Sequence, residues 1–148
     1  MEIRLESTRG LSREAEVWVD GTLLVAMDEY SAPDKRTPPG LLHDAKFMYM
    51  AEEGVDWPAA IRANPSRRKR IEPVRGWRYV GYGRVVDIMP VVIDFGLLCM
   101  EDANWTNEEQ LVGQFVRVEI DRLSLVRAAP DELEDVEPEA RPPDPESR

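Results

Sequence analysis

Apolar and polar residues alternate along much of this chain, which is the pattern of strands with one buried face. Residues 2–7 alternate isoleucine and leucine with charged side chains. Residues 14–19 and 22–28 are rich in valine, leucine and tryptophan, and they flank the dipeptide Asp20-Gly21. This dipeptide favours the type I′ turn of a two-residue hairpin. The N-terminal part is therefore predicted to contain one strand followed by a tight β-hairpin.

The middle of the chain has a less regular pattern. Residues 30–42 contain three prolines and a glycine and are predicted to form a long loop. Residues 46–52 are predicted to form a strand, with Phe47 and Tyr49 on one face and the two methionines on the other. Asp56 is a suitable N-cap for a short helix over residues 57–63.

The C-terminal half is predicted to form longer strands. Residues 77–89 are extended, and Gly81 and Gly83 indicate the curvature that barrel strands need. Three further elements follow: an apolar strand, a helical turn and a last alternating strand, over residues 91–100, 107–111 and 114–126. Six or seven strands with about one short helix predict a mainly β protein, a small closed or half-closed antiparallel β-barrel.

Three segments between about residues 80 and 121 resemble strands of OB-fold modules. They are Gly83-Arg84-Val85-Val86-Asp87-Ile88, Val92-Ile93-Asp94-Phe95-Gly96 and Val112-Gly113-Gln114-Phe115-Val116-Arg117-Val118-Glu119-Ile120-Asp121. In such modules a glycine-led strand runs into an apolar strand with an acidic-glycine turn, and a V-G-x-x-V-x-V segment opens a later strand. The resemblance implies a β-barrel. The stacking aromatics that such modules use on nucleic acid have no equivalents at residues 91–93.

Composition places the protein among globular chains. A length of 148 residues is enough for one domain with its own core. No apolar run is long enough to span a bilayer, and the first residues are charged where a signal peptide needs an apolar block. The single cysteine, Cys99, excludes an internal disulfide and fits a reducing compartment. We expect a cytoplasmic protein that contacts no membrane and carries no cofactor.

Charge is distributed very unevenly along the chain. The net charge is −10, yet residues 62–84 hold eight basic residues and one acid, Glu72. Residues 130–148 hold eight acids, two arginines and five prolines. Such a segment buries too little apolar surface to offset its ordering entropy. We expect a disordered acidic, proline-rich tail at 130–148 after a single domain at 1–129.

The basic segment has three interpretations: a solvated loop balanced by the protein's own acids, a site for single-stranded nucleic acid, or a docking surface for an acidic protein. The cluster at residues 67–70 is predicted to lie in an exposed loop between Pro65 and Pro73. Trp77 and Tyr79 share one strand face. The candidate contact residues are Arg67, Arg68, Lys69, Arg70, Arg75, Trp77, Arg78, Tyr79, Tyr82, Arg84 and Trp105.

Candidate catalytic and metal-binding groups are few. His43 is the only histidine and is next to Asp44, but adjacency in sequence does not create a catalytic dyad. Cys99 lies in an apolar run and is predicted to be an inert core thiol. One histidine and one cysteine cannot supply a structural zinc site. No catalytic constellation is found, and we expect neither an enzyme nor a metal protein.

One carboxylate pair depends on the strand register. A tight turn at Pro90-Val91 would place Asp87 opposite Asp94, where two carboxylates would need a shared proton or a cation. Alternatively, the turn is longer and the register different, or both carboxylates project to solvent near Arg84 or Arg117. Both alternatives remain open from the sequence.

The sequence favours a non-enzymatic binding module, an accessory, adaptor or immunity-type protein that binds another protein. Trp105, in a polar stretch, is expected to be either an exposed anchor for that partner or a plug on one barrel end. The alternative is single-stranded nucleic-acid binding through residues 67–84, with the acidic tail modulating the affinity.

Overall fold

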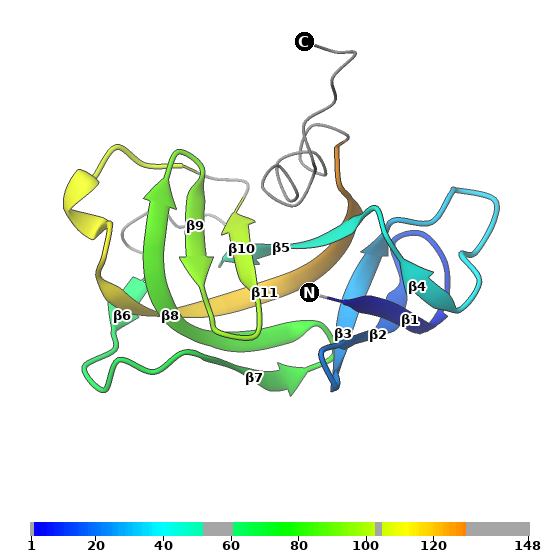
Figure 1. Cartoon of the computed structure of the whole chain (residues 1–148), viewed down its shortest axis with the longest axis horizontal. Helices are drawn as coiled ribbons and strands as arrows, with labels where there is room; N and C mark the ends of the chain where they lie inside the picture. The colour runs from blue at the N-terminus through cyan, green and yellow to red at the C-terminus, as the bar shows by residue number, and fades with distance from the viewer. Residues whose placement is uncertain (1, 52–60, 103–104, 130–148) are drawn as a thin grey trace, which may run out of the picture.

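The computed structural model describes residues 2–51, 61–102 and 105–129, which form a mainly β architecture (Figure 1). Within these ranges, the helical structure is limited to one 3₁₀ turn, η1 (Glu109–Leu111). The strands are β1 (Ile3–Thr8), β2 (Glu14–Val19), β3 (Thr22–Glu29), β4 (Gly40–Leu42), β5 (Ala45–Ala51), β6 (Ile61–Ala63), β7 (Arg70–Arg75), β8 (Arg78–Ile88), β9 (Val91–Asp94), β10 (Cys99–Asp102) and β11 (Phe115–Arg127).

Five of these strands close into a small barrel. Strands β8, β9 and β10 form an antiparallel meander, and β10 pairs in parallel with β5. Strand β5 pairs antiparallel with β11, and β11 pairs antiparallel with β8, which completes the ring. The predicted β-barrel is confirmed, and of the two alternatives it is the closed one. The prediction that all its strands are antiparallel is wrong, because β10 and β5 run parallel.

Strand β11 also joins the barrel to the N-terminal part of the same sheet, in the order β4–β1–β2–β3. The first half of β11 lies between β8 and β6, and its second half lies between β5 and β3. In Figure 1, β11 runs across the molecule from the barrel toward the N-terminal strands. The two parts therefore share one strand and one continuous sheet.

The barrel interior is filled through close approach of β9 and the following turn to β8. A Cβ added at Gly81 would lie 2.4 Å from the Phe95 ring, and one at Gly83 would lie 2.3 Å from the Asp94 carbonyl oxygen. The Phe95 ring in turn packs edge-on against Tyr49, with ring centroids 5.5 Å apart. The glycine spacing in β8 thus serves barrel packing, as the sequence predicts.

The predicted N-terminal elements are confirmed. Strands β2 and β3 pair from Val19–Thr22 outward. Asp20 and Gly21 have φ values of 46° and 85°, as a type I′ turn requires. The predicted loop at residues 30–42 ends in strand β4, which pairs with β1.

Four predictions are wrong in the described residues. Gly40–Leu42 is strand β4 and not loop, and the predicted loop between Pro65 and Pro73 includes the start of strand β7 (Arg70–Arg75). The other two concern residues 91–100 and 57–63. The run 91–100 is not one strand, because Phe95 N–H donates to the Leu98 carbonyl at 2.7 Å and closes a turn between β9 and β10. Residues 61–63 form strand β6 instead of helix, since they pair with β11. The remainder of that predicted helix, with Asp56, and the predicted tail at 130–148 lie outside the described residues.

In the part of the chain that the structure describes, no helix has the length and apolar character needed to cross a membrane.

A buried carboxylate organises the loop between β3 and β4. Asp28 is 1% exposed and accepts hydrogen bonds from the backbone N–H groups of Tyr30 and Ser31, both at 2.8 Å. It also accepts bonds from the hydroxyls of Thr8 and Ser31. Burial by itself raises the pKa of Asp28, but the hydrogen bonds from Ser31, Thr8 and Tyr30 outweigh it and leave the pKa below its ordinary value. The ionised carboxylate therefore holds β1 and this loop together.

We predict that Asp28→Asn lowers the free energy of unfolding at pH 7 by about 1–3 kcal/mol, because charge-assisted bonds are lost. A lowered folded-state pKa means that Asp28 stabilises the fold above its unfolded pKa and loses this effect as pH falls through the folded value. The difference between the two proteins in urea denaturation should therefore narrow below about pH 4. Asp34→Asn, at an exposed acid in the same loop, is the control. A constant difference down to pH 2 would contradict this account.

Candidate functional site: a basic and aromatic barrel face

Four outward-facing residues from four neighbouring strands line up across the barrel surface. Arg62 on β6 pairs with Arg117 on β11, Arg117 pairs with Tyr82 on β8, and Tyr82 pairs with Arg70 on β7. Directly paired residues project from the same side of a sheet, so this row presents three guanidinium groups around one phenol ring. At ordinary strand spacing the row spans about 14 Å.

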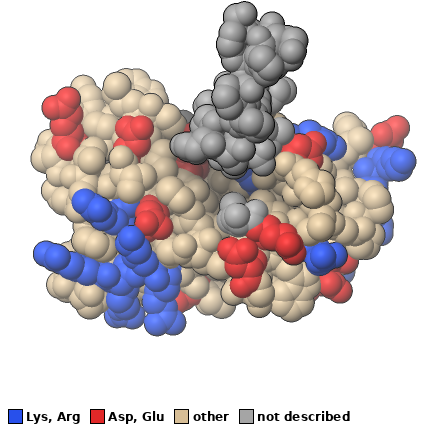
Figure 2. Space-filling view, viewed as in Figure 1, with Lys and Arg blue, Asp and Glu red and all other residues tan. Residues whose placement is uncertain are grey.

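A second aromatic residue and three further arginines extend this surface. Phe115 on β11 pairs with Arg84 on β8, one step along from the first row. The Arg67 guanidinium lies 5.6 Å from the centroid of the Phe115 ring, and that of Arg68 lies 4.8 Å from the centroid of Tyr82. We call this surface the basic barrel face; it comprises Arg62, Arg67, Arg68, Arg70, Tyr82, Arg84, Phe115 and Arg117. Figure 2 shows Lys and Arg gathered over the part of the molecule that holds β6, β7 and β8.

Asn64 holds the loop that carries the two stacked arginines. Its amide donates to the Arg68 carbonyl at 2.9 Å and to the Val116 carbonyl at 3.4 Å, and its oxygen accepts from Arg68 N–H at 3.2 Å. Asn64 is 5% exposed, and Arg67 adopts a positive φ of 54° at the tip of this loop. The loop is thereby anchored on β11, and the arginines are held over rings of the neighbouring strands.

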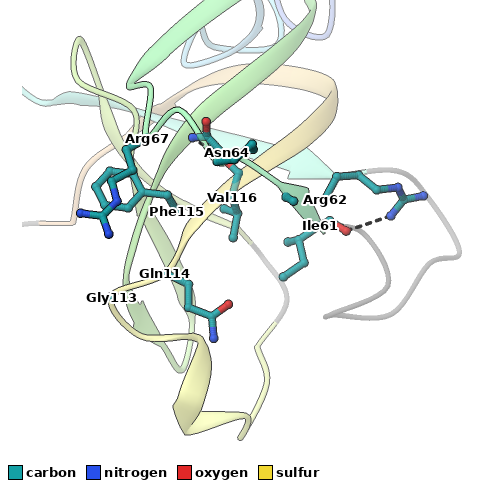
Figure 3. Close-up of a pocket in the computed structure, with 10 residues that line it drawn as sticks. Ile61, Arg62, Asn64, Arg67, Gly113, Gln114, Phe115 and Val116 are labelled. Carbon is teal, nitrogen blue, oxygen red and sulfur yellow. Dashed lines mark hydrogen bonds between the residues drawn. The ribbon is translucent and has the colours of Figure 1, made fainter.

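A hollow opens beside this loop, between β6 and the start of β11 (Figure 3). It encloses about 640 Å³ and is lined by Ile61, Arg62, Ala63, Asn64, Pro65, Arg67, Gly113, Gln114, Phe115 and Val116. Arg67 lies against Phe115 at one side of the hollow, whereas Arg62 extends away on the other side. The hollow thus offers an aromatic edge and cations at its rim.

Acids limit the basic barrel face on two sides. Lys69 Nζ lies 2.8 Å from Asp94 Oδ2, and this ion pair, with a bond from Gly96 N–H, holds the pKa of Asp94 below its ordinary value. Arg70 lies 2.9 Å from Glu72. Glu72 belongs to the next row, which continues through Val80 to Glu119. The face is therefore a bounded patch and not a uniformly basic surface.

The structure brings five of the predicted contact residues together: Arg67, Arg68, Arg70, Tyr82 and Arg84. Lys69 lies at the margin, tied to Asp94. Arg75 and Arg78 face each other at the other end of the β7–β8 pair, where Arg78 lies 3.6 Å from Asp121. Trp77 lies half-buried in the turn between them.

Tyr79 does not lie on this surface. It is 3% exposed, and its hydroxyl donates to the Val25 carbonyl at 2.8 Å and accepts from Val25 N–H at 2.7 Å. Tyr79 and Tyr82 project from opposite faces of β8, so only Tyr82 remains available to a ligand. Tyr79 instead ties the barrel to the exposed edge of β3.

Trp105 is exposed at 66% and does not plug the barrel. The N–H of the next residue, Thr106, donates to the Ile88 carbonyl at 2.9 Å, which places Trp105 beside the β8–β9 turn. It belongs to neither row of the basic barrel face.

The register separates the two carboxylates that the sequence placed opposite each other. Asp87 pairs with Val92, and a bulge at Val86 places Arg84 opposite Asp94. The alternative in which Asp94 faces a cation is the one that the structure shows. An acid–base or cation site between Asp87 and Asp94 is thereby overturned.

Other candidates for chemistry also change. Asp44 accepts hydrogen bonds from Tyr30 and Arg127, whereas His43 is exposed beside it. Cys99 is exposed on β10 opposite Asp94 and is not the core thiol that the sequence predicts. Partial burial and the Asp94 charge raise the pKa of this thiol. Within the described ranges, no group of three His, Cys, Asp or Glu residues is placed to hold a metal ion.

Three surface residues were missed as candidates by the sequence analysis: Arg62, Phe115 and Arg117. The alternation with the buried Val116 and Val118 predicts that Arg117 points outward, and it gives the same direction for Phe115. Their proximity to Tyr82 depends on the β8–β11 register, which no local pattern shows.

The chain was compared with protein-family models, curated proteins and solved structures, and nothing in any of the three sets matches it.

Proposed function

We propose that this protein is a non-enzymatic module that binds single-stranded nucleic acid on the basic barrel face. The observation that carries the proposal is the juxtaposition of guanidinium groups and aromatic rings across four strands, with Arg68 stacked on Tyr82 and Arg67 near Phe115.

The chemistry of this surface suits an unpaired strand. Guanidinium groups form paired hydrogen bonds to phosphate oxygens and release counterions. Unpaired bases stack on aromatic rings and on guanidinium planes, and these faces are hidden inside a duplex. A surface that offers both groups within about 14 Å favours a flexible single strand.

We further infer that the barrel is of OB type. The segment that carries the resemblance supplies β8, β9, β10 and β11, and β5 completes the ring from earlier in the chain. OB-fold barrels bind oligonucleotides on one outer face and its loops. Here the outward residues of β9 are Val92 and Asp94, so the proposed contacts lie on β8 and β11 instead.

We predict that Arg67, Arg68 and Arg70 mutated together to Glu weaken binding of a labelled mixed-sequence single strand by at least about tenfold. Fluorescence anisotropy with the full chain at several salt concentrations measures this. A plot of log affinity against log salt concentration has a negative slope, and its magnitude should decrease by about 2, since three phosphate contacts are removed. The matched control is Arg9, Arg13 and Arg36 mutated to Glu, which changes net charge equally at exposed positions elsewhere.

A stacking variant separates this site from general charge attraction. Tyr82→Ala should weaken binding by about tenfold at constant net charge, because base stacking is lost. Trp105→Ala, at an exposed ring elsewhere, should not. Equal losses in both charge-reversed triples, or no binding by the native protein at low salt, would overturn the proposal.

The acidic tail is predicted to compete for the same surface. Residues 130–148 carry eight acids, and every described strand ends before residue 130. Removing these residues should tighten single-strand binding at low salt. The difference between the shortened and the full chain should become smaller at high salt, because salt screens the attraction between the tail and the basic barrel face. Anisotropy of residues 1–129 beside the full chain measures the change. Identical affinities at all salt concentrations would contradict a modulating tail.

A second candidate function is binding of another protein, which the exposure of Trp105 supports. Met89, in the β8–β9 turn, is 62% exposed, and a backbone bond between Thr106 and Ile88 places it near Trp105. Exposed tryptophans are frequent anchors in protein interfaces. If this function holds, Trp105→Ala should abolish capture of a partner that binds the native protein and the Tyr82→Ala variant equally.

A further inference from the structure

A second cross-strand row crosses the outer face of the N-terminal sheet. Leu41 on β4 pairs with Arg4 on β1, Arg4 pairs with Trp18 on β2, and Trp18 pairs with Leu23 on β3. The exposed fractions of Leu41, Trp18 and Leu23 are 43%, 36% and 41%. Three large apolar side chains therefore lie in one line on the surface, interrupted by a single cation.

Acidic side chains surround this row. Glu6 accepts a hydrogen bond from the Trp18 indole N–H at 2.9 Å, and Glu16 lies one step along β2 on the same face. Glu2 lies 3.9 Å from Arg4, and its backbone N–H bonds to Asp20 at 3.3 Å. Figure 2 shows acidic side chains beside the N-terminal end of β1, apart from the basic cluster. Four acids against one base leave this face with a local charge of about −3.

A groove runs along the indole. It encloses about 440 Å³ and is lined by Glu2, Arg4, Trp18, Asp20 and Gly21. A cation that enters this groove would meet the indole and the carboxylates of Glu2 and Asp20, beside the Arg4 guanidinium, which lies 3.9 Å from Glu2. Cation–π attraction is strongest for tryptophan, and the carboxylates add direct ion pairing.

The sheet presents this surface in a fixed arrangement. The alternate side chains of β1 and β2, Ile3, Leu5, Val17 and Val19, are at most 4% exposed. The hydrogen bond to Glu6 further orients the Trp18 ring. These side chains therefore lose little conformational entropy when a ligand binds.

We propose that this acidic apolar face, formed by Glu2, Arg4, Glu6, Glu16, Trp18, Asp20, Leu23 and Leu41, binds a basic and apolar segment of a partner protein. The partner places an arginine or lysine over Trp18 between the carboxylates, and aliphatic side chains against Leu23 and Leu41. The charge complementarity that favours this occupant also repels nucleic acid and anionic membranes. The proposal is independent of single-strand binding because it uses no residue of the basic barrel face.

The test uses a labelled peptide that alternates arginine with leucine, and anisotropy with the full chain. Trp18→Thr, a substitution suited to an exposed strand position, should weaken peptide binding by about tenfold. Val86→Thr is the matched control, at an apolar side chain that is 43% exposed on strand β8, and should leave the affinity unchanged. Glu16→Gln should weaken binding and its salt dependence, whereas Glu109→Gln, at an exposed acid near η1, should not.

Each other outcome overturns the proposal. Equal affinity in the native protein and in the Trp18→Thr and Glu16→Gln variants would assign the peptide to the tail or another acidic surface. Absence of binding at low salt, or equal binding of a peptide with glutamate in place of arginine, would also exclude it. If sedimentation shows that the native chain self-associates and Trp18→Thr prevents this, the occupant is a second copy instead. Should Trp18→Thr fail to fold by circular dichroism, Leu23→Thr serves in its place.

Discussion

The double pairing of β11 is the constraint on which the rest of the structure depends. Its first half completes the barrel against β8, and its second half pairs with both β5 and β3. Leu123, Ser124 and Leu125 are buried in succession, whereas a strand with one solvent-exposed face would alternate buried and exposed residues. Continuous burial is what a strand covered on both faces shows. The barrel and the N-terminal strands are therefore held together by hydrogen bonds to opposite edges of the same strand.

The same strand determines how the two proposed binding surfaces are arranged. Arg117 of β11 lies between Arg62 and Tyr82 only because β6 and β8 pair with the same residues of β11 from opposite sides. The acidic apolar face lies on strands β1 to β4, which reach the barrel through β3. Where β3 and β11 diverge, the Tyr79 hydroxyl bonds to both backbone groups of Val25. One chain thus presents a basic and an acidic surface on two parts of one sheet that share a core.

Local patterns were sufficient for the features that depend on neighbouring residues. The Asp20-Gly21 hairpin, the shared strand face of Phe47 and Tyr49, and the curvature at Gly81 all follow from spacing and turn chemistry. That the face of Phe47 and Tyr49 is the buried one did not follow from them. The break between β9 and β10 was missed because Leu97 and Leu98 continue the apolar run through the turn. Gly96, at φ of 91°, and the acidic-glycine turn implied by the OB-fold resemblance at residues 94–96 were the signals of that turn.

The candidate site was predictable in composition but not in geometry. The cluster of arginines with aromatic residues marked the segment that contributes five residues to the basic barrel face, yet it could not decide that Tyr79 is buried and Tyr82 only half-buried. That difference follows from which face of β8 meets the core. The bulge at Val86 likewise changes the partner of Asp94, and the roles of Phe115 and Arg117 depend on pairing between segments that are distant in sequence.

The most direct test of the central claim is to map a bound single strand on the full chain by NMR, from amide shifts of ¹⁵N-labelled protein during titration with a short mixed-sequence DNA. The account predicts saturable shifts at residues 67–70, 82–84 and 115–117, with little change in β1 and β2. Shifts confined to the N-terminal sheet, or none at millimolar DNA and low salt, would contradict it.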